Sequence, residues 1–164
     1  MYGKKEVYEL LDSRGIEYIA VEHEAVYNIE EADRLELPHR EAATKNLFIK
    51  DDKKRNYFVV VIPEYDRLNL RALREKIQSR PLKFANENEL MDIMGLIPGQ
   101  VTPFGTLNDK EHKVKVIFDE YFRNGLMDAH PNDNTATMIL KTQDVIKVLD
   151  EFGVPYEFLA LSED

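Results

Sequence analysis

Residues 44–62 read TKNLFIKDDKKRNYFVVVI. Two apolar-rich runs, Lys45–Ile49 and Tyr57–Ile62, flank the polar turn Asp51–Asn56, a pattern that predicts an antiparallel hairpin. The run Phe58–Ile62 is apolar on both faces, as is typical of a strand in the middle of a sheet. We therefore expect the hairpin to lie at the centre of the fold.

Before the hairpin, the sequence predicts a helix, a strand and a second, short helix. Apolar residues at positions 7, 10 and 11 share one helical face, and Gly15 is placed to end that helix. The alternating run Ile16–Val21 then predicts a strand. Asn28 and Glu31 have the spacing of a capping box, which predicts a short helix running to about Leu37.

After the hairpin, helices and strands continue to the end of the chain. Capping and apolar spacing predict helices that start near Asn69, at Asn86 and at Thr142. Strands are expected over residues 114–118, 126–129, 135–140 and 156–161. The fold class is therefore α+β, with a mixed, strongly curved, barrel-like β-sheet wrapped by helices. A length of 164 residues fits a single domain over residues 1–164.

Charge limits how this chain can contact nucleic acid. The formal net charge is -9, which argues against nonspecific binding to a phosphate backbone. The stretch Arg67–Lys83 differs, because it holds six basic residues and one acid. Any contact with nucleic acid is therefore expected to be local.

Composition also excludes several kinds of chemistry. The chain has no cysteine, so disulfides, thiolate nucleophiles and cysteine zinc sites are excluded. Its four histidines are widely spaced, so we expect no metal site, and no phosphate-binding or nucleophile-elbow motif is present. No apolar run approaches the roughly 18 residues that span a membrane, and we expect a cytoplasmic protein.

Three segments carry groups that could bind a ligand: Thr44–Phe48, Gly95–Gly105 and His130–Thr135. In the first, Lys45 could hold a phosphate as a point charge, although a lysine there is ordinarily solvated. The second is rich in Gly and Pro, so it is either a connection or a stiff wall that presents backbone N–H groups. The third reads as a turn that explains every residue except His130.

Together these segments resemble the family of YbaK and the prolyl-tRNA-synthetase-associated editing domains. The resemblance covers nearly the whole chain and rests on the order of its motifs: GIEY at 15–18, EH at 22–23, TKNLF at 44–48, GLIPGQVTPFG at 95–105, and HPN at 130–132 with Thr135. The segment PGQVTPFG at 98–105 is similar to the branch that clears alanine from proline tRNA. The cysteine-clearing branch typically has a Gly-Gly-x-Ser-Pro type of loop here.

The resemblance implies an aminoacyl-tRNA deacylase that acts in trans on Ala-tRNA(Pro), a carboxylic ester hydrolase without a cofactor. It implies catalytic roles for Lys45, Asn46 and His130. The implied substrate-binding residues are Ile97, Gly99, Gln100, Val101, Thr102, Pro103, Phe104, Asn132 and Thr135, with Ile97 and Phe104 as pocket walls. The implied tRNA contacts are Arg67, Arg71 and Arg74, which supply the local basic face of an otherwise acidic chain.

Two other functions remain open from the sequence. One is a deacylase for Cys-tRNA(Pro) or another aminoacyl ester, and the other is a non-catalytic module that binds aminoacyl-tRNA or a synthetase. In each case the expected partner is the acceptor end of proline tRNA, with prolyl-tRNA synthetase as a transient partner. We expect a monomer, because no long exposed apolar face is evident.

Overall fold

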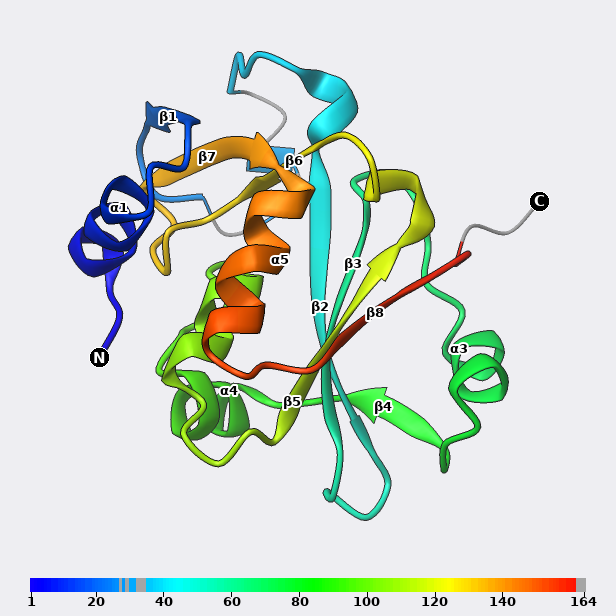
Figure 1. The fold of residues 1–164 in the computed structure, drawn as a ribbon. Coiled ribbons are helices and arrows are strands. Elements are labelled where there is room, and N and C mark those ends of the chain that lie inside the picture. The colour runs from blue at the N-terminus through cyan, green and yellow to red at the C-terminus, as the bar shows by residue number, and fades with distance from the viewer. Residues whose placement is uncertain (27, 29, 32–34, 162–164) are drawn as a thin grey trace.

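The computed structural model describes residues 1–26, 28, 30–31 and 35–161. Its larger sheet has five strands in the order β4-β2-β3-β5-β8. The hairpin β2 (Thr44–Asp51) and β3 (Tyr57–Pro63) is antiparallel, and it places Lys45 opposite Ile62. The remaining strands are β4 (Leu82–Phe84), antiparallel to β2, and β5 (Val114–Asp119) and β8 (Tyr156–Leu159), each parallel to its neighbour. The predicted central hairpin is confirmed (Figure 1).

A smaller antiparallel sheet has the order β1-β7-β6, with β1 (Tyr18–Glu22), β7 (Ala136–Lys141) and β6 (Leu126–Ala129). The α+β class is confirmed, but the strands divide between two sheets and neither closes into a barrel. The strands form two sheets because β6 and β2 are not connected by a ladder of backbone hydrogen bonds. Instead, the side chain of Asp128 in β6 accepts hydrogen bonds from Thr44 at the start of β2.

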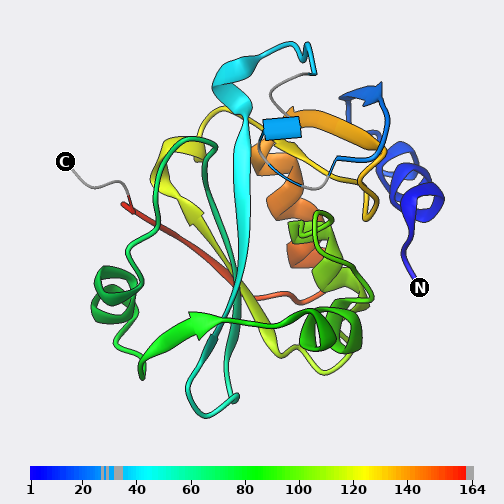
Figure 2. The ribbon, with the colours of Figure 1, turned by 180° about the vertical axis from the view of Figure 1, so that it is seen from behind.

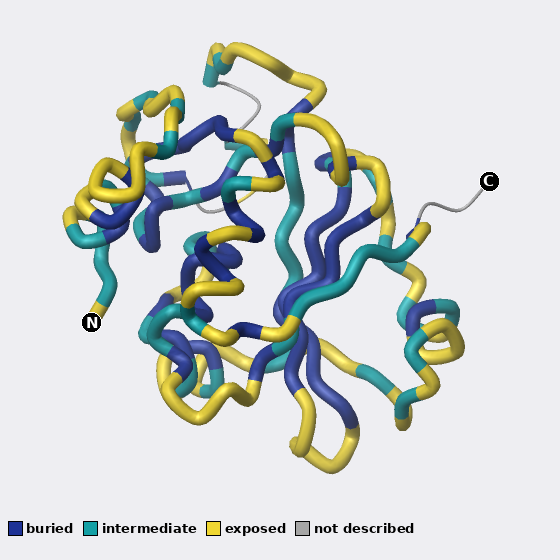
Figure 3. The backbone as a smooth tube through the Cα atoms, viewed as in Figure 1, coloured by how far each residue is buried: buried dark blue, intermediate teal, exposed yellow. Residues whose placement is uncertain are grey.

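The helices are α1 (Lys4–Ser13), α3 (Leu70–Ile77), α4 (Glu87–Met94) and α5 (Thr142–Glu151). Figures 1 and 2 show α5 and α3 on opposite faces of the larger sheet. Alternate residues of β3 serve the two faces: Val59 and Val61 belong to the main core, and Val60 packs in the cluster beneath α3. β3 is therefore buried on both faces, as predicted (Figure 3).

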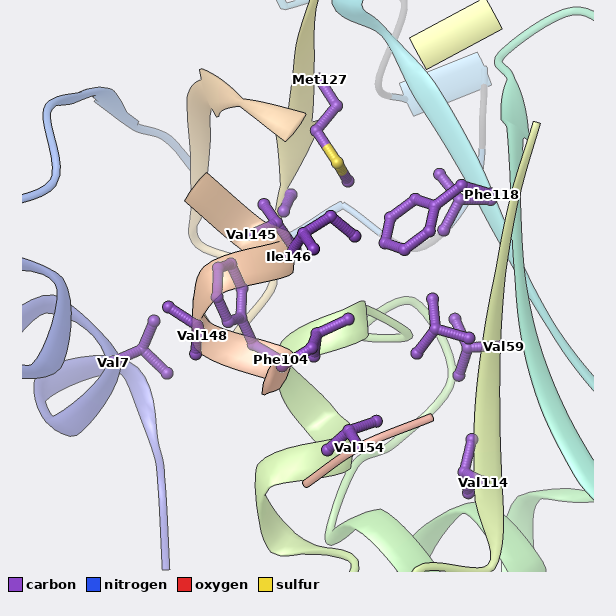
Figure 4. Packing of buried hydrophobic residues seen from close by; sticks show 14 of the residues in the cluster. Val7, Val59, Phe104, Val114, Phe118, Met127, Val145, Ile146, Val148 and Val154 are labelled. Atoms are coloured by element: carbon purple, nitrogen blue, oxygen red, sulfur yellow. The ribbon is translucent and has the colours of Figure 1, made fainter. Parts of the chain in front are cut away.

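The main core fills the space between the larger sheet and α5. Figure 4 shows Phe118 of β5 and Ile146 of α5 pointing toward one another across this space, whereas Val148 lies on the side of α5 that faces Val7, and all of these residues and Phe104 are buried. The side chain of Phe104 comes from η2 (Pro103–Asn108), a short 3-10 helix at the end of the Gly- and Pro-rich loop. Because Phe104 is buried in this core, it anchors the end of the Gly- and Pro-rich loop.

Element boundaries follow local capping chemistry. Asn69 caps α3 and Asn86 caps α4, each accepting a backbone N–H, as the sequence predicts. The strand β4 was not predicted, because three residues are too few to show an alternating pattern. The helix η2 was not predicted, because the glycines and prolines of this segment indicate a loop. The predicted helix from Asn28 to about Leu37 falls largely on residues outside the described ones, although Asn28 Oδ1 accepts the Glu31 N–H at 2.8 Å.

Two further 3-10 turns, η1 (Arg40–Ala42) and η3 (Glu120–Phe122), complete the described elements. Among the described residues, no helix is both long and apolar enough to cross a membrane.

Candidate active site

A pocket of about 240 Å³ opens where the start of β2 meets the end of β6. All three predicted segments contribute to its lining: Lys45 and Asn46 from β2, Gly99 from the loop, and His130 just after β6. Its apolar lining is Val26, Leu35, Leu37, Val101 and Ala129. Residues far apart in sequence therefore form one site.

Hydrogen bonds between segments hold this site together. The hydroxyl of Thr102 donates to the backbone oxygen of His130 at 2.9 Å, which ties the Gly- and Pro-rich loop to the third segment. The backbone N–H and the hydroxyl of Thr44 donate to Asp128 Oδ1 at 2.9 and 2.7 Å, which ties β2 to β6. The relative positions of Lys45, Asn46 and His130 depend on these bonds.

The Thr44–Asp128 contact also fixes how the Asn46 amide is oriented. Since the hydroxyl hydrogen of Thr44 is used by Asp128, its oxygen can only accept, and it accepts from Asn46 Nδ2 at 3.2 Å. Asn46 Oδ1 is then left buried without a hydrogen-bond partner among the described residues. A buried acceptor without a donor is unfavourable until a ligand supplies one.

Asp128 is the carboxylate at the centre of this arrangement. Burial raises its pKa to about 6, although both Thr44 hydrogen bonds oppose the change. The charge of Glu64 raises this pKa further, and that of Arg40 lowers it. Arg40 and Glu64 form an ion pair of 2.9 Å at the pocket wall. Asp128 is therefore mostly ionised at pH 7 and becomes protonated as the pH falls below about 6.

His130 is a neutral imidazole at pH 7. Burial lowers the pKa of His130, and the nearby His23 lowers it as well. The hydrogen bond to the Ala136 oxygen raises this pKa and only partly offsets the effect of burial. Its Nδ1 lies 3.1 Å from the backbone oxygen of Ala136, which can only accept, so Nδ1 carries the proton. Nε2 is consequently an acceptor.

Lys45 is the basic group of the pocket. Its ammonium has no ion-pair partner among the described residues, and its side chain is half-buried at the start of β2. A lysine in this position is an available point charge for an anionic ligand.

The loop supplies backbone donors. The N–H of Gln100 donates to the Ile97 oxygen at 3.0 Å, while the N–H groups of Gly99 and Val101 donate to no group in the described part of the chain. Gly99 has a φ of 91°, a left-handed conformation that favours glycine. The loop therefore presents two unused N–H groups beside a pocket that both residues line.

Several predicted substrate-binding residues lie elsewhere. Phe104 is fully buried in the main core, and Ile97 is 39% exposed, so neither lines the pocket. The Asn132 amide donates to the backbone oxygens of Tyr2 and Phe104 at 2.7 and 3.1 Å, a structural role. The others outside the pocket lining are Gln100, Thr102, Pro103 and Thr135. An alternating or loop pattern does not reveal which way such side chains point.

The predicted tRNA-contacting arginines lie on and next to α3. Arg71 and Arg74 line a shallow hollow with Ser79, and Arg67 is exposed before the helix. None of the three lines the pocket. The hollow also includes the acidic residue Glu75, and Arg67 does not line it.

Sequence reasoning missed three charged residues of the pocket: Asp128, Arg40 and Glu64. A signal existed only for Asp128, which is a carboxylate inside the short apolar strand 126–129. Among the described residues, no group of three or more His, Asp or Glu side chains is arranged to hold a metal ion.

Comparisons with known proteins identify the family to which this chain belongs. The family model of the aminoacyl-tRNA editing domain matches residues 23–148. The prolyl-tRNA editing protein ProX of Acetoanaerobium sticklandii is 36% identical over 162 residues, which cover 98% of this chain and 99% of that protein. The prolyl-tRNA synthetase associated domain-containing protein 1 of Danio rerio is 33% identical over 156 residues, covering 90% of this chain and 82% of that protein.

A solved structure of a candidate trans-editing enzyme for prolyl tRNA synthetase has the same fold, with a TM-score of 0.72 at 19% identity. It covers 98% of this chain, and this chain covers 97% of it. On the family model and the 36% identical relative, the chain belongs to the aminoacyl-tRNA editing domain family.

Proposed function

We propose that this protein is a free-standing aminoacyl-tRNA deacylase that hydrolyses Ala-tRNA(Pro). The observation that carries the proposal is the pocket in which Lys45, Asn46, His130 and the loop N–H groups lie together. The near full-length similarity to a protein named as a prolyl-tRNA editing protein supports proline tRNA as the carrier. Such a protein acts in the cytoplasm and, we propose, as a monomer.

The chemistry needs only a placed water and a stabilised oxyanion, because the aminoacyl ester is already activated. Lys45 holds a phosphate of the terminal adenosine, and Asn46 and His130 fix the aminoacyl group. The unused N–H groups of Gly99 and Val101 face the developing oxyanion. A ribose hydroxyl of the tRNA orients the attacking water.

Amino-acid selectivity in this proposal comes from the size of the pocket. The apolar lining includes Leu37, Val101 and Ala129, and not the two walls expected from the sequence. A small apolar pocket admits alanine and excludes the proline ring, which makes it a second sieve for a synthetase that separates small side chains poorly. Correctly charged Pro-tRNA is thereby spared.

The body of the tRNA contacts the basic surface of Arg67, Arg71 and Arg74 in this proposal. Contacts of this kind strengthen binding without reading the amino acid, so their removal raises KM and leaves kcat unchanged. Prolyl-tRNA synthetase is a transient partner that supplies the mischarged tRNA.

The test is hydrolysis of proline tRNA charged with alanine, cysteine, serine or proline, with wild-type protein and the variants Lys45→Ala and His130→Ala. Lys53→Ala is the matched control, because this exposed lysine lies in the β2–β3 turn. We expect selective loss of alanine, a drop of about 10- to 100-fold for Lys45→Ala and none for the control.

Preferred hydrolysis of the cysteine ester would instead identify a Cys-tRNA(Pro) deacylase. Binding of every substrate without hydrolysis would refute the proposal and leave a non-catalytic module.

A further inference from the structure

Three hydrogen-bond acceptors on residues that line the pocket receive no hydrogen bond from any described residue. Asp128 Oδ1 is occupied by Thr44, but no described residue donates to its second oxygen, Oδ2. Asn46 Oδ1 is buried without a donor, and His130 Nε2 is an acceptor because Nδ1 carries the proton. Three acceptors from two strands and one loop thus line one pocket and lack donors in the described part of the chain.

The charges of the pocket are also separated. Arg40 and Glu64 neutralise each other, which leaves the Lys45 ammonium and the Asp128 carboxylate. These two do not form an ion pair with each other, as no contact within 4.0 Å joins them. A complementary ligand therefore has an anionic group for Lys45 and, elsewhere, a cationic group with several N–H donors for Asp128.

An α-ammonium group meets this description, because it carries one positive charge and three N–H donors on a single atom. We propose that Asp128, with Asn46 and His130, forms a subsite for the free α-ammonium group of the aminoacyl ester. This inference rests on the proposed function and deepens it: the enzyme recognises the ester as that of a free amino acid. Esters whose nitrogen is acylated or replaced are excluded.

The subsite also explains why Asp128 is tied to Thr44. The two Thr44 donors hold Oδ1 and thereby fix the orientation of the carboxylate, Oδ2 receives no hydrogen bond from a described residue, and the same hydroxyl turns Asn46 Oδ1 away from Thr44. One residue thus positions two acceptors for the same cation. A fixed acceptor set of this kind gives specificity at little entropic cost.

The test measures binding rather than hydrolysis, so it is independent of whether the protein is a deacylase. The probes are 3′-amino-3′-deoxyadenosine 5′-phosphate acylated through its 3′ nitrogen with L-alanine or with L-lactic acid. These amides resist hydrolysis, and the lactoyl probe replaces the ammonium with a hydroxyl of similar size. Affinity is measured by calorimetry at pH 7, above the pKa of about 6 of Asp128 and below that of an α-amino group, about 8.

We expect wild-type protein to bind the alanyl probe about 10- to 100-fold more tightly than the lactoyl probe. Asp128→Asn retains an oxygen for the Thr44 donors but loses the charge, and it should bring the two affinities within a few fold. Asp52→Asn is the matched control, because this acid pairs with Arg80 outside the pocket, and it should keep the full preference.

Equal affinity of wild-type protein for both probes, no measurable binding of the alanyl probe, or full preference in Asp128→Asn would overturn the subsite. Hydrolysis of Ala-tRNA(Pro) is scored separately. If the protein prefers the alanyl probe but hydrolyses no ester, the subsite stands and the proposed function is refuted. If it hydrolyses Ala-tRNA(Pro) but binds both probes equally, the proposed function stands and the subsite is refuted.

Discussion

Replacing Asp128 with asparagine should stabilise the protein at neutral pH. Burial raises the pKa of this carboxyl from 3.8 to about 6, which means that the folded state holds its charge at a cost relative to the unfolded state. Asparagine has nearly the same shape, keeps an oxygen for the two Thr44 donors and carries no charge. The substitution removes the electrostatic cost and leaves the connection between the two sheets.

The magnitude follows from the change in pKa. Each pKa unit corresponds to about 1.4 kcal/mol, so the shift destabilises the ionised form by about 3 kcal/mol. Well below pH 3.8 the carboxyl is protonated in both states and the cost is absent, and at pH 4.0 the cost is only about 0.6 kcal/mol. The cost grows as pH rises and is fully present above about pH 6, so the gain from Asp128→Asn must appear over this window.

Urea unfolding followed by circular dichroism at pH 4.0 and pH 7.5 checks this, since both values avoid the isoelectric point near 5.0. With an m value of about 2 kcal/mol per molar urea, the midpoint at pH 7.5 should rise by about 1.5 M, with little change at pH 4.0. Asp52→Asn should give no gain, because the hydrogen bond from Arg80 lowers the pKa of Asp52. An Asp128→Asn midpoint at or below wild type at pH 7.5, or an equal rise at both pH values, would refute this account.

Three further outcomes are expected. Phe104→Ala should lower the free energy of unfolding by about 3–5 kcal/mol, because Phe104 is fully buried in the core, and calorimetry measures this loss. A variant of unchanged stability but altered amino-acid selectivity would instead place the ring in the pocket. Leu37→Ala should enlarge the pocket and let Pro-tRNA be hydrolysed, as a deacylation assay would show, whereas continued sparing of Pro-tRNA would exclude this wall. Lys50→Ala should cost about 2–3 kcal/mol in urea unfolding at pH 7, because it removes a buried ammonium that donates to the largely shielded Glu89 carboxylate, and an unchanged midpoint would show that the pair contributes nothing.

Much of the fold was predictable because its signals are local. The apolar run Phe58–Ile62 predicted a strand buried on both faces, and its residues do alternate between the two cores. Asn69 and Asn86 each accept a backbone N–H, as the sequence indicated. The split into two sheets was not predictable, because it depends on a contact between Thr44 and Asp128, which lie 84 residues apart.

Capping, periodicity and motif order are properties of neighbouring residues, so most of the helices and strands, the family and the three segments that meet at the pocket were predictable from the sequence. Which side chains those segments turn toward the pocket depends on the folded structure. Phe104 lies within the predicted loop but packs in the core, while Asp128 lies in a predicted strand without having been expected at the site, and it lines the pocket. Side-chain direction and the pKa of a carboxyl depend on residues that are distant in the chain, so a linear pattern does not contain them.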